Sequence, residues 1–121
     1  MKTILAVDDD PMATTLIRDV LTAAGYQVFT ASNGKSGIES AVANKPNLIL
    51  LDVMMPKIDG YMTLSELKKN DTTKRIPVVM VTAVGYEMNK HLAMNMGAVD
   101  YVTKPVDIRS LRTIAAQYAG A

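Results

Sequence analysis

Carboxylate, hydroxyl and ammonium side chains directly follow several short apolar runs of this chain. Asp8 and Asp9 follow the first run, and Asp52 ends the third. Thr82 ends the fourth run, and Lys104 comes shortly after the fifth. Carboxylates in one cleft repel one another, because unit charges about 4 Å apart cost roughly 4 kcal/mol at an effective dielectric of 20. If these run ends meet in space, either a carboxyl group takes up a proton or a cation joins the cluster.

A hard divalent cation with oxygen ligands suits such a set of side chains. Mg²⁺ typically takes one or two carboxylates, waters and a phosphate oxygen. Lys104 can neutralise a further anion as a point charge, and Thr82 can donate a hydroxyl hydrogen bond. A carboxylate nucleophile beside Mg²⁺, a lysine and a hydroxyl make a site that accepts a phosphoryl group as an aspartyl phosphate.

The elements that must position these side chains alternate along the chain. Apolar runs predict strands at 4–7, 27–30, 47–51, 76–81 and 99–102, and helical periodicity predicts helices at 11–24, 35–44, 60–69, 86–96 and 107–118. Five strand–helix repeats indicate an α/β fold with a parallel sheet, helices on both faces and right-handed crossovers. In such sheets ligands bind at the carboxyl ends of the strands, so the polar side chains should converge on that rim.

Capping residues and apolar spacing define the helices further. Asp10 and Pro11 predict a helix start, with Asp10 as N-cap, and Gly25 predicts its end. The residues expected to face the core from the first two helices are Met12, Leu16, Ile17, Val20, Leu21, Ala24, Ile38 and Val42. The third helix carries the apolar residues Leu64 and Leu67. Asn33-Gly34 is read as a turn before the second helix.

Composition excludes several classes of protein. The 121 residues suffice for one domain with one core. A net charge of +1 gives no bulk electrostatic reason to bind nucleic acid or an anionic membrane directly. The chain has no cysteine and a single histidine, His91, so thiolate and histidine-cluster metal sites are excluded. Neither a membrane-spanning run nor a signal peptide is evident, so the cytoplasm is the expected compartment.

Four motifs occur in order, each after its expected strand. They are Val7-Asp8-Asp9-Asp10-Pro11, Leu51-Asp52-Val53-Met54-Met55-Pro56 with Asp59-Gly60, Val81-Thr82-Ala83, and Tyr101-Val102-Thr103-Lys104-Pro105. Each motif is weak alone, but the ordered set is specific. The sequence resembles a response regulator receiver domain of two-component signal transduction, of the chemotaxis-regulator type. The resemblance implies a doubly wound, flavodoxin-like (βα)₅ fold with strand order 2-1-3-4-5.

The resemblance also implies a role for each matched residue. Asp52 would be the phosphoacceptor, and Asp8, Asp9, Asp52 and the backbone carbonyl of Met54 would hold Mg²⁺. Lys104 would contact the phosphoryl group and precede a cis peptide bond to Pro105. Thr82 would be the switch hydroxyl and Tyr101 the coupled aromatic, although Tyr101 could instead be a core aromatic.

The implied function is a phosphorylation-dependent signalling switch. A histidine kinase or phosphotransfer protein would supply the phosphoryl group, and the chain would catalyse only its own phosphorylation and dephosphorylation. Activation would change the surface of the helix at 86–96, the strand at 99–102 and the helix at 107–118. The downstream protein or output domain stays open, as does the choice between a stand-alone domain at 1–121 and an excised part of a longer regulator.

Other functions are possible on a similar sheet. An unphosphorylated receiver-like binding module is the main alternative, and the intact set of site residues argues against it. A flavoprotein or dinucleotide enzyme would require a glycine-rich loop after the first strand, where Asp8-Asp9-Asp10-Pro11-Met12 stands instead. An aspartate-based phosphatase would require an acidic residue two positions after the nucleophile, where the chain has Met54.

Met54 and Val84 also bear on the lifetime of an acyl phosphate. Hydrolysis requires a water in line with phosphorus, and positioning carries most of the catalysis in such reactions. The residues two beyond Asp52 and two beyond Thr82 are placed to hold that water, and both are apolar. Slow self-dephosphorylation is therefore expected.

Overall fold

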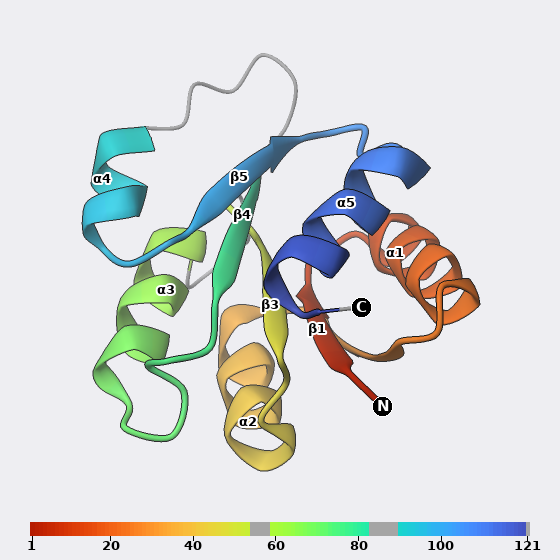
Figure 1. The fold of residues 1–121 in the computed structure, drawn as a ribbon. Helices are drawn as coiled ribbons and strands as arrows, with labels where there is room; N and C mark the ends of the chain where they lie inside the picture. The colour runs from red at the N-terminus through yellow and green to blue at the C-terminus, as the bar shows by residue number, and fades with distance from the viewer. Residues whose placement is uncertain (54–58, 83–89, 121) are drawn as a thin grey trace.

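The computed structural model describes residues 1–53, 59–82 and 90–120. Within them, strands and helices alternate as β1 (Thr3–Val7), α1 (Pro11–Ala23), β2 (Gln27–Ala31), α2 (Gly34–Asn44), β3 (Leu48–Asp52), α3 (Gly60–Lys69), β4 (Val78–Thr82), α4 (Lys90–Asn95), β5 (Asp100–Thr103) and α5 (Ile108–Tyr118). All strand pairs are parallel, and the strand order is β2-β1-β3-β4-β5 (Figure 1). The predicted fold class, a doubly wound five-stranded parallel sheet, is confirmed.

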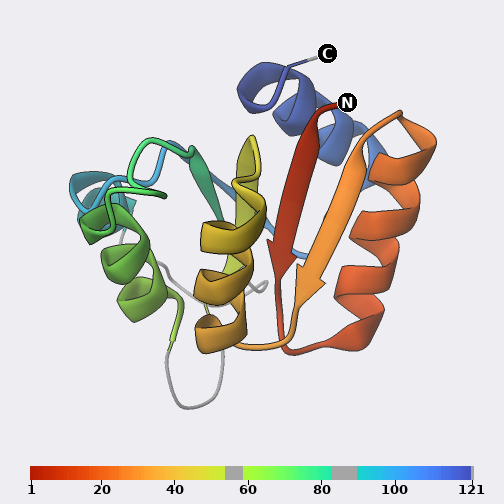
Figure 2. The same ribbon diagram turned by 90° about the horizontal axis from the view of Figure 1, so that it is seen from below.

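Helices cover both faces of the sheet. Helices α1 and α5 lie side by side on one face, and α2, α3 and α4 lie on the other (Figures 1 and 2). Successive strand residues point to opposite faces, so Ile4 packs in the core beneath α1 and α5 whereas Leu5 packs in the core beneath α2 and α3. The central strands β3 and β4 are therefore shielded from water on both faces, whereas the edge strands β2 and β5 are partly exposed.

The central strands read as unbroken apolar sequences because both of their faces are covered. Every residue of β3 and β4 is buried, including the terminal Asp52 and Thr82. β4 begins at Val78, two residues later than predicted, because Pro77 has no N–H to donate to the ladder. The Pro77 carbonyl still accepts from Ile49 N at 3.0 Å.

Helix α1 buries a narrower stripe than the sequence predicted. Ile17, Val20 and Leu21 are buried as expected. The prediction was wrong for Met12 and Leu16, whose exposed fractions are 80% and 44%. At 3.6 residues per turn these two lie about 130° and 90° from the centre of the buried arc, so their spacing is helical but their direction is outward.

Two further predictions of inward-facing residues were wrong. Ala24 is exposed because it is the C-cap, beyond the last turn of α1. Val42 is 37% exposed because α2 rests on its small residues Gly37 and Ala41, while Ile38 is half-buried beside them. The apolar residues Leu64 and Leu67 of α3 are buried.

Caps fix where the helices begin and end. Asp10 is the N-cap of α1, and its carboxylate accepts from Met12 N at 2.9 Å, as predicted. Gly25 follows the C-cap with φ +100°, a conformation that glycine adopts without strain. The chain bends at Ser32 and Asn33, where the sequence predicts a turn. Asn33 is also the N-cap of α2 and accepts from Ser36 N at 2.9 Å, so the helix begins at Gly34, one residue earlier than predicted.

The predicted helix at 86–96 is described only from Lys90 onward; residues 86–89 lie outside the described residues. Among the helices that are described, none combines the length and the apolar character needed to cross a bilayer.

Candidate functional site

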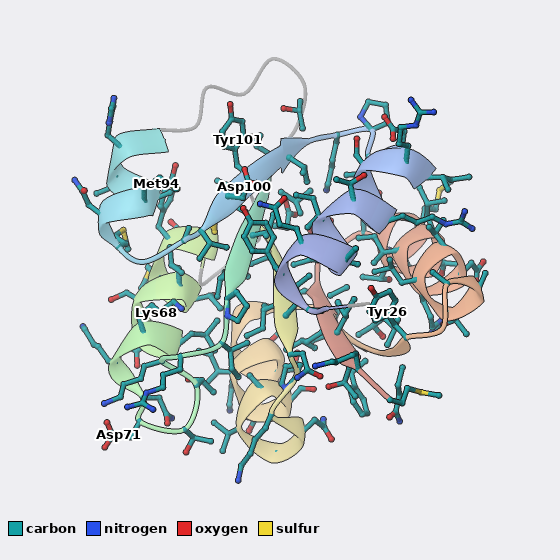
Figure 3. The ribbon with its side chains drawn as sticks, in the orientation of Figure 1. Tyr26, Lys68, Asp71, Met94, Asp100 and Tyr101 are labelled. Carbon is teal, nitrogen blue, oxygen red and sulfur yellow. The ribbon has the colours of Figure 1, made fainter. Side chains whose placement is uncertain are left out.

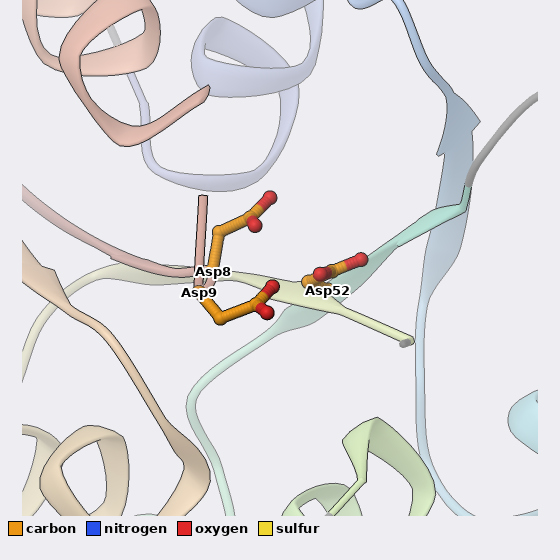
Figure 4. Close-up of side chains that lie close together, drawn as sticks. All are labelled: Asp8, Asp9 and Asp52. Carbon is orange, nitrogen blue, oxygen red and sulfur yellow. The ribbon is translucent and has the colours of Figure 1, made fainter. Parts of the chain in front are cut away.

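Three carboxylates meet at the carboxyl ends of β1 and β3. Ligand oxygens of Asp8, Asp9 and Asp52 all lie within 4.8 Å of one another (Figure 4). Asp8 and Asp9 directly follow β1, and Asp52 is the last residue of the neighbouring strand β3. The parallel pairing of the two strands therefore produces the predicted convergence.

The three carboxylates differ in their exposure to solvent. Asp8 and Asp52 are each only 3% exposed, whereas Asp9 is exposed. Backbone groups hold Asp8 in place, since its amide donates to Ala31 O at 3.0 Å and its Oδ1 accepts from Asp10 N at 2.9 Å. The cluster thus has two fixed, buried carboxylates and a third that faces solvent.

Lys104 places a cation against the buried pair. Its Nζ lies 2.7 Å from Asp8 Oδ2 and 3.6 Å from Asp52 Oδ1. Burial acts to lower the pKa of Lys104, but the hydrogen bond to Asp8 and the charges of Asp52 and Asp8 outweigh it, so the pKa is raised. Lys104 therefore stays protonated and offsets part of the repulsion among the carboxylates.

Pairing of β4 with β5 brings Lys104 to this position. Thr82 ends β4 opposite Thr103, and Lys104 N donates to Thr82 O at 2.6 Å. The Lys104–Pro105 peptide bond is cis. Thr82 is only 4% exposed, at the end of the strand next to Asp52.

Tyr101 lies on the edge strand β5 (Figure 3), two strands from Asp52 in the order of the sheet. It pairs with Met80 in the register and is half-buried against the core beneath α2, α3 and α4. The structure therefore brings Asp8, Asp9, Asp52 and Lys104 together, with Thr82 on the strand next to Asp52 and Tyr101 one strand beyond Thr82. The predicted roles of Met54 and Val84 fall on residues outside the described ranges.

A groove beside the carboxylates is a feature that the sequence did not reveal. Its volume is about 580 Å³, and it is lined by Asp10, Met12, Ala13, Leu16, Ile17, Val81, Lys104, Pro105 and Val106. Met12 and Leu16 contribute to it because they face outward from α1. The angle of Met12 and Leu16 from the centre of the buried stripe of α1 is the sequence signal that could have predicted this groove.

The donor set fits a hard divalent cation. Within the described residues the cluster offers only oxygen ligands, one from each of Asp8, Asp9 and Asp52. Such ligands suit Mg²⁺, which keeps several waters and takes few carboxylates. The exposed side of the cluster at Asp9 leaves room for those waters.

Fold and site together define a class: a doubly wound α/β domain with an acidic cluster that could hold a cation at the carboxyl ends of its strands. Residues 4–116 match the family described as the response regulator receiver domain. The chain belongs to this family, and its expected resemblance to it is confirmed. Receiver domains are signalling modules of two-component systems, in which response regulators receive phosphate from histidine kinases and act on downstream targets.

Curated relatives differ in how much of their length the chain spans. It is 40% identical over 121 residues to the protein PilH of Pseudomonas aeruginosa, covering 99% of this chain and 100% of PilH. It is 41% identical over 111 residues to RpaA of Synechocystis, a DNA-binding dual master transcriptional regulator, covering 92% of this chain but 46% of RpaA. The chain thus spans about half of some relatives and the whole of another.

Solved structures share the fold closely. The chemotaxis protein CheY4 of Vibrio cholerae has a TM-score of 0.91 at 25% identity, with 98% of both chains covered. The receiver domain of the sensor histidine kinase PA1611 of Pseudomonas aeruginosa has a TM-score of 0.88 at 28% identity, with 99% of this chain and 98% of that chain covered. The latter structure is described with a magnesium ion coordinated in its active-site cleft.

Proposed function

We propose that the chain is a phosphorylation-dependent signalling switch in which Asp52 accepts the phosphoryl group. The observation that carries this proposal is the cluster of Asp8, Asp9 and Asp52 with oxygens within 4.8 Å, joined by the Lys104 ammonium. Asp52 is the best candidate for the nucleophile because it ends a central strand and lies farther from Lys104 than Asp8 does. Lys104 thus holds Asp52 less closely than it holds Asp8.

Phosphoryl transfer to Asp52 requires only the phosphohistidine donor and a proton from solvent. An oxygen of Asp52 forms a bond to phosphorus while the bond from phosphorus to the donor's imidazole nitrogen breaks. The electron pair of the broken bond leaves with the imidazole, which is neutralised by a proton from solvent. The product is an acyl phosphate on Asp52 and an unphosphorylated histidine on the kinase or phosphotransfer protein.

Asp8, Asp9, Asp52 and the carbonyl of Met54 would hold Mg²⁺. When bound, Mg²⁺ would neutralise charge on the phosphoryl oxygens. Asp9 is exposed, so its carboxylate can replace its solvating water with the ion. Asp8 is buried and would supply one ligand oxygen in a fixed position. The residues of the chain thus provide a rigid inner side and an open outer side for the ion.

Lys104 has two roles in this proposal. Before transfer, its contact with Asp8 at 2.7 Å keeps the ammonium near Asp52 but more closely bound to Asp8. After transfer, the new dianion at Asp52 competes for the ammonium and draws it from 3.6 Å into direct contact. The lysine therefore stabilises the phosphorylated form more than the free form.

Propagation of the signal would start at Thr82. Its hydroxyl would turn toward the new phosphoryl oxygens, and Tyr101 would fill the space that it leaves. Because Tyr101 stands on β5, the change would reach the surface of α4, β5 and α5, where a downstream protein or an output domain would bind. We place the receiver domain at residues 1–121 and its action in the cytoplasm, with no direct contact to nucleic acid or membrane.

Intact mass measurement tests the proposal. Incubation with acetyl phosphate and Mg²⁺ should add one phosphate to the wild type and none to Asp52→Asn, and chelation of Mg²⁺ should abolish the adduct. Asp59→Asn is the matched control: it makes the same chemical change at an exposed N-cap of α3, where asparagine also caps well. A wild type that takes up no phosphate would favour the unphosphorylated binding module instead.

A further inference from the structure

The first helical residue of α3 lies directly against the backbone of Asp52. A Cβ atom added at Gly60 would overlap the carbonyl oxygen of Asp52 and would lie 2.7 Å from Val53 Cα and 3.1 Å from Asp52 C. All three neighbouring atoms belong to the backbone, which cannot rotate away as a side chain can. At Gly37, by contrast, the nearest atoms are the side-chain methyl carbons of Val7 at 2.9 and 3.0 Å.

Hydrogen bonds clamp the peptide that Gly60 touches. Val53 N donates to Val81 O of β4 at 2.9 Å, and Gly60 N donates to Val53 O at 2.9 Å. The carbonyl of the following peptide is thus held by α3, and the N–H of the peptide between Asp52 and Val53 is held by β4. Its orientation sets the direction of the Asp52 side chain.

Helix α3 has no room to retreat from this contact. Its first turn is closed by Asp59, which accepts from Met62 N at 2.9 Å through its carboxylate and from Thr63 Oγ1 at 3.0 Å through its carbonyl. Thr63 and Leu64 are both fully buried. A side chain at position 60 would therefore displace the Asp52 peptide rather than the helix.

We propose that Gly60 is a positioning residue for the phosphoacceptor, because only a residue without a side chain lets α3 hold the Asp52 peptide where its carboxylate meets Asp8, Asp9 and Lys104. This inference rests on the proposed function of Asp52. It adds a residue outside the polar cluster on which the position of the Asp52 carboxylate depends. Gly60 touches neither phosphate nor metal and acts through the backbone of Asp52 alone.

The test compares Gly60→Ala with Leu67→Ala. Leu67 is buried about two turns further along α3, so its truncation lowers stability at a site remote from the Gly60 contact. Three quantities are measured: the Mg²⁺ dissociation constant by calorimetry, the maximal phosphorylation rate with acetyl phosphate, and the amide chemical shifts of Asp52 and Val53 in metal-free protein. Trimethylamine N-oxide, which favours compact states, keeps all variants folded.

Gly60→Ala should weaken Mg²⁺ binding, shift both amides and slow phosphorylation on the order of 10- to 100-fold, because small misplacements of a reacting group are costly. Leu67→Ala should stay within about twofold of wild type, as expected for a distant, independent site. Equal effects of the two variants, an unaffected Gly60→Ala, or a Gly60→Ala that does not fold even with the osmolyte would each overturn the positioning role. Failure of the wild type itself to accept phosphate would instead overturn the proposed function.

Discussion

The Lys104 ammonium lies 2.7 Å from Asp8 and 3.6 Å from Asp52, so it is held more closely by Asp8 than by the proposed phosphoacceptor. Through this contact the ammonium partly neutralises the negative charge of the clustered carboxylates. The contact also makes the lysine available to a new anion at Asp52, because the ammonium has to move only a short distance.

Asp8→Asn should lower the pKa of Lys104. Burial already acts to lower this pKa, and the hydrogen bond to Asp8 is the largest influence that raises it. With an amide at position 8, Asp52 would remain as an anionic partner of Lys104. The titration of the Lys104 ε-methylene signals by NMR measures the effect.

Asp71→Asn is the control for this titration. Asp71 pairs with Lys74 at 3.0 Å in the loop after α3, at the opposite end of the sheet (Figure 3). Asp71→Asn should leave the pKa of Lys104 unchanged. A Lys104 pKa that is equal in Asp8→Asn and wild type would show that Asp8 does not hold the lysine in solution.

Asp9→Ala should weaken Mg²⁺ binding without lowering the stability of the metal-free protein. Removing one of several crowded like charges relieves repulsion, and Asp9 is exposed, so no core contact is lost. The free energy of unfolding should stay within about 0.5 kcal/mol of wild type or rise. Calorimetric Mg²⁺ titration and urea midpoints provide the two measurements, and a clear loss of stability without metal would refute the electrostatic argument.

Ionisation of Tyr118 should lower the stability of the fold at alkaline pH. Its hydroxyl donates to Asp100 Oδ2 at 2.8 Å, and burial together with Asp100 raises the pKa of Tyr118. A raised folded-state pKa stabilises the fold fully below the unfolded value of about 10, and this stabilisation is lost as pH rises through the folded-state pKa. Stability should therefore fall as Tyr118 ionises.

Tyr118→Phe isolates this contribution. The variant should cost about 1 kcal/mol at neutral pH, the usual worth of one hydrogen bond. Between about pH 8 and pH 11 its urea midpoint should fall less than that of wild type, because it cannot ionise at position 118. Parallel declines of the two proteins would assign the alkaline loss to other groups.

Much of this architecture could be predicted from the sequence because buried parallel strands and strand-end carboxylates leave local patterns. Asp52 at the end of 47–51 is one example, and Asp10 before Pro11 is another. The outward direction of Met12 and Leu16 was harder, since helical spacing alone does not say which arc meets the sheet. The contact of Lys104 with Asp8, and that of Gly60 with the Asp52 carbonyl, depend on distances between strands and helices far apart in sequence.

The phosphoryl lifetime should be set in part by Met54 and Val84. A thioether is a weak acceptor and an isopropyl group offers none, so neither side chain can hold an attacking water well. The double variant Met54→Asn, Val84→Glu should therefore lose phosphate faster once the donor is removed. Decay followed by intact mass gives the rate, and an equal or slower decay in the double variant would show that these positions do not control hydrolysis.

The position of the phosphate tests the central claim most directly. An acyl phosphate is reduced by borohydride to an alcohol, which converts a phosphorylated aspartate to homoserine. After phosphorylation with acetyl phosphate and Mg²⁺, reduction, digestion and tandem mass spectrometry should find homoserine at position 52 and nowhere else. Homoserine at position 8 or 9, or no reduced residue in a protein that carries phosphate, would contradict the assignment of Asp52 as the phosphoacceptor.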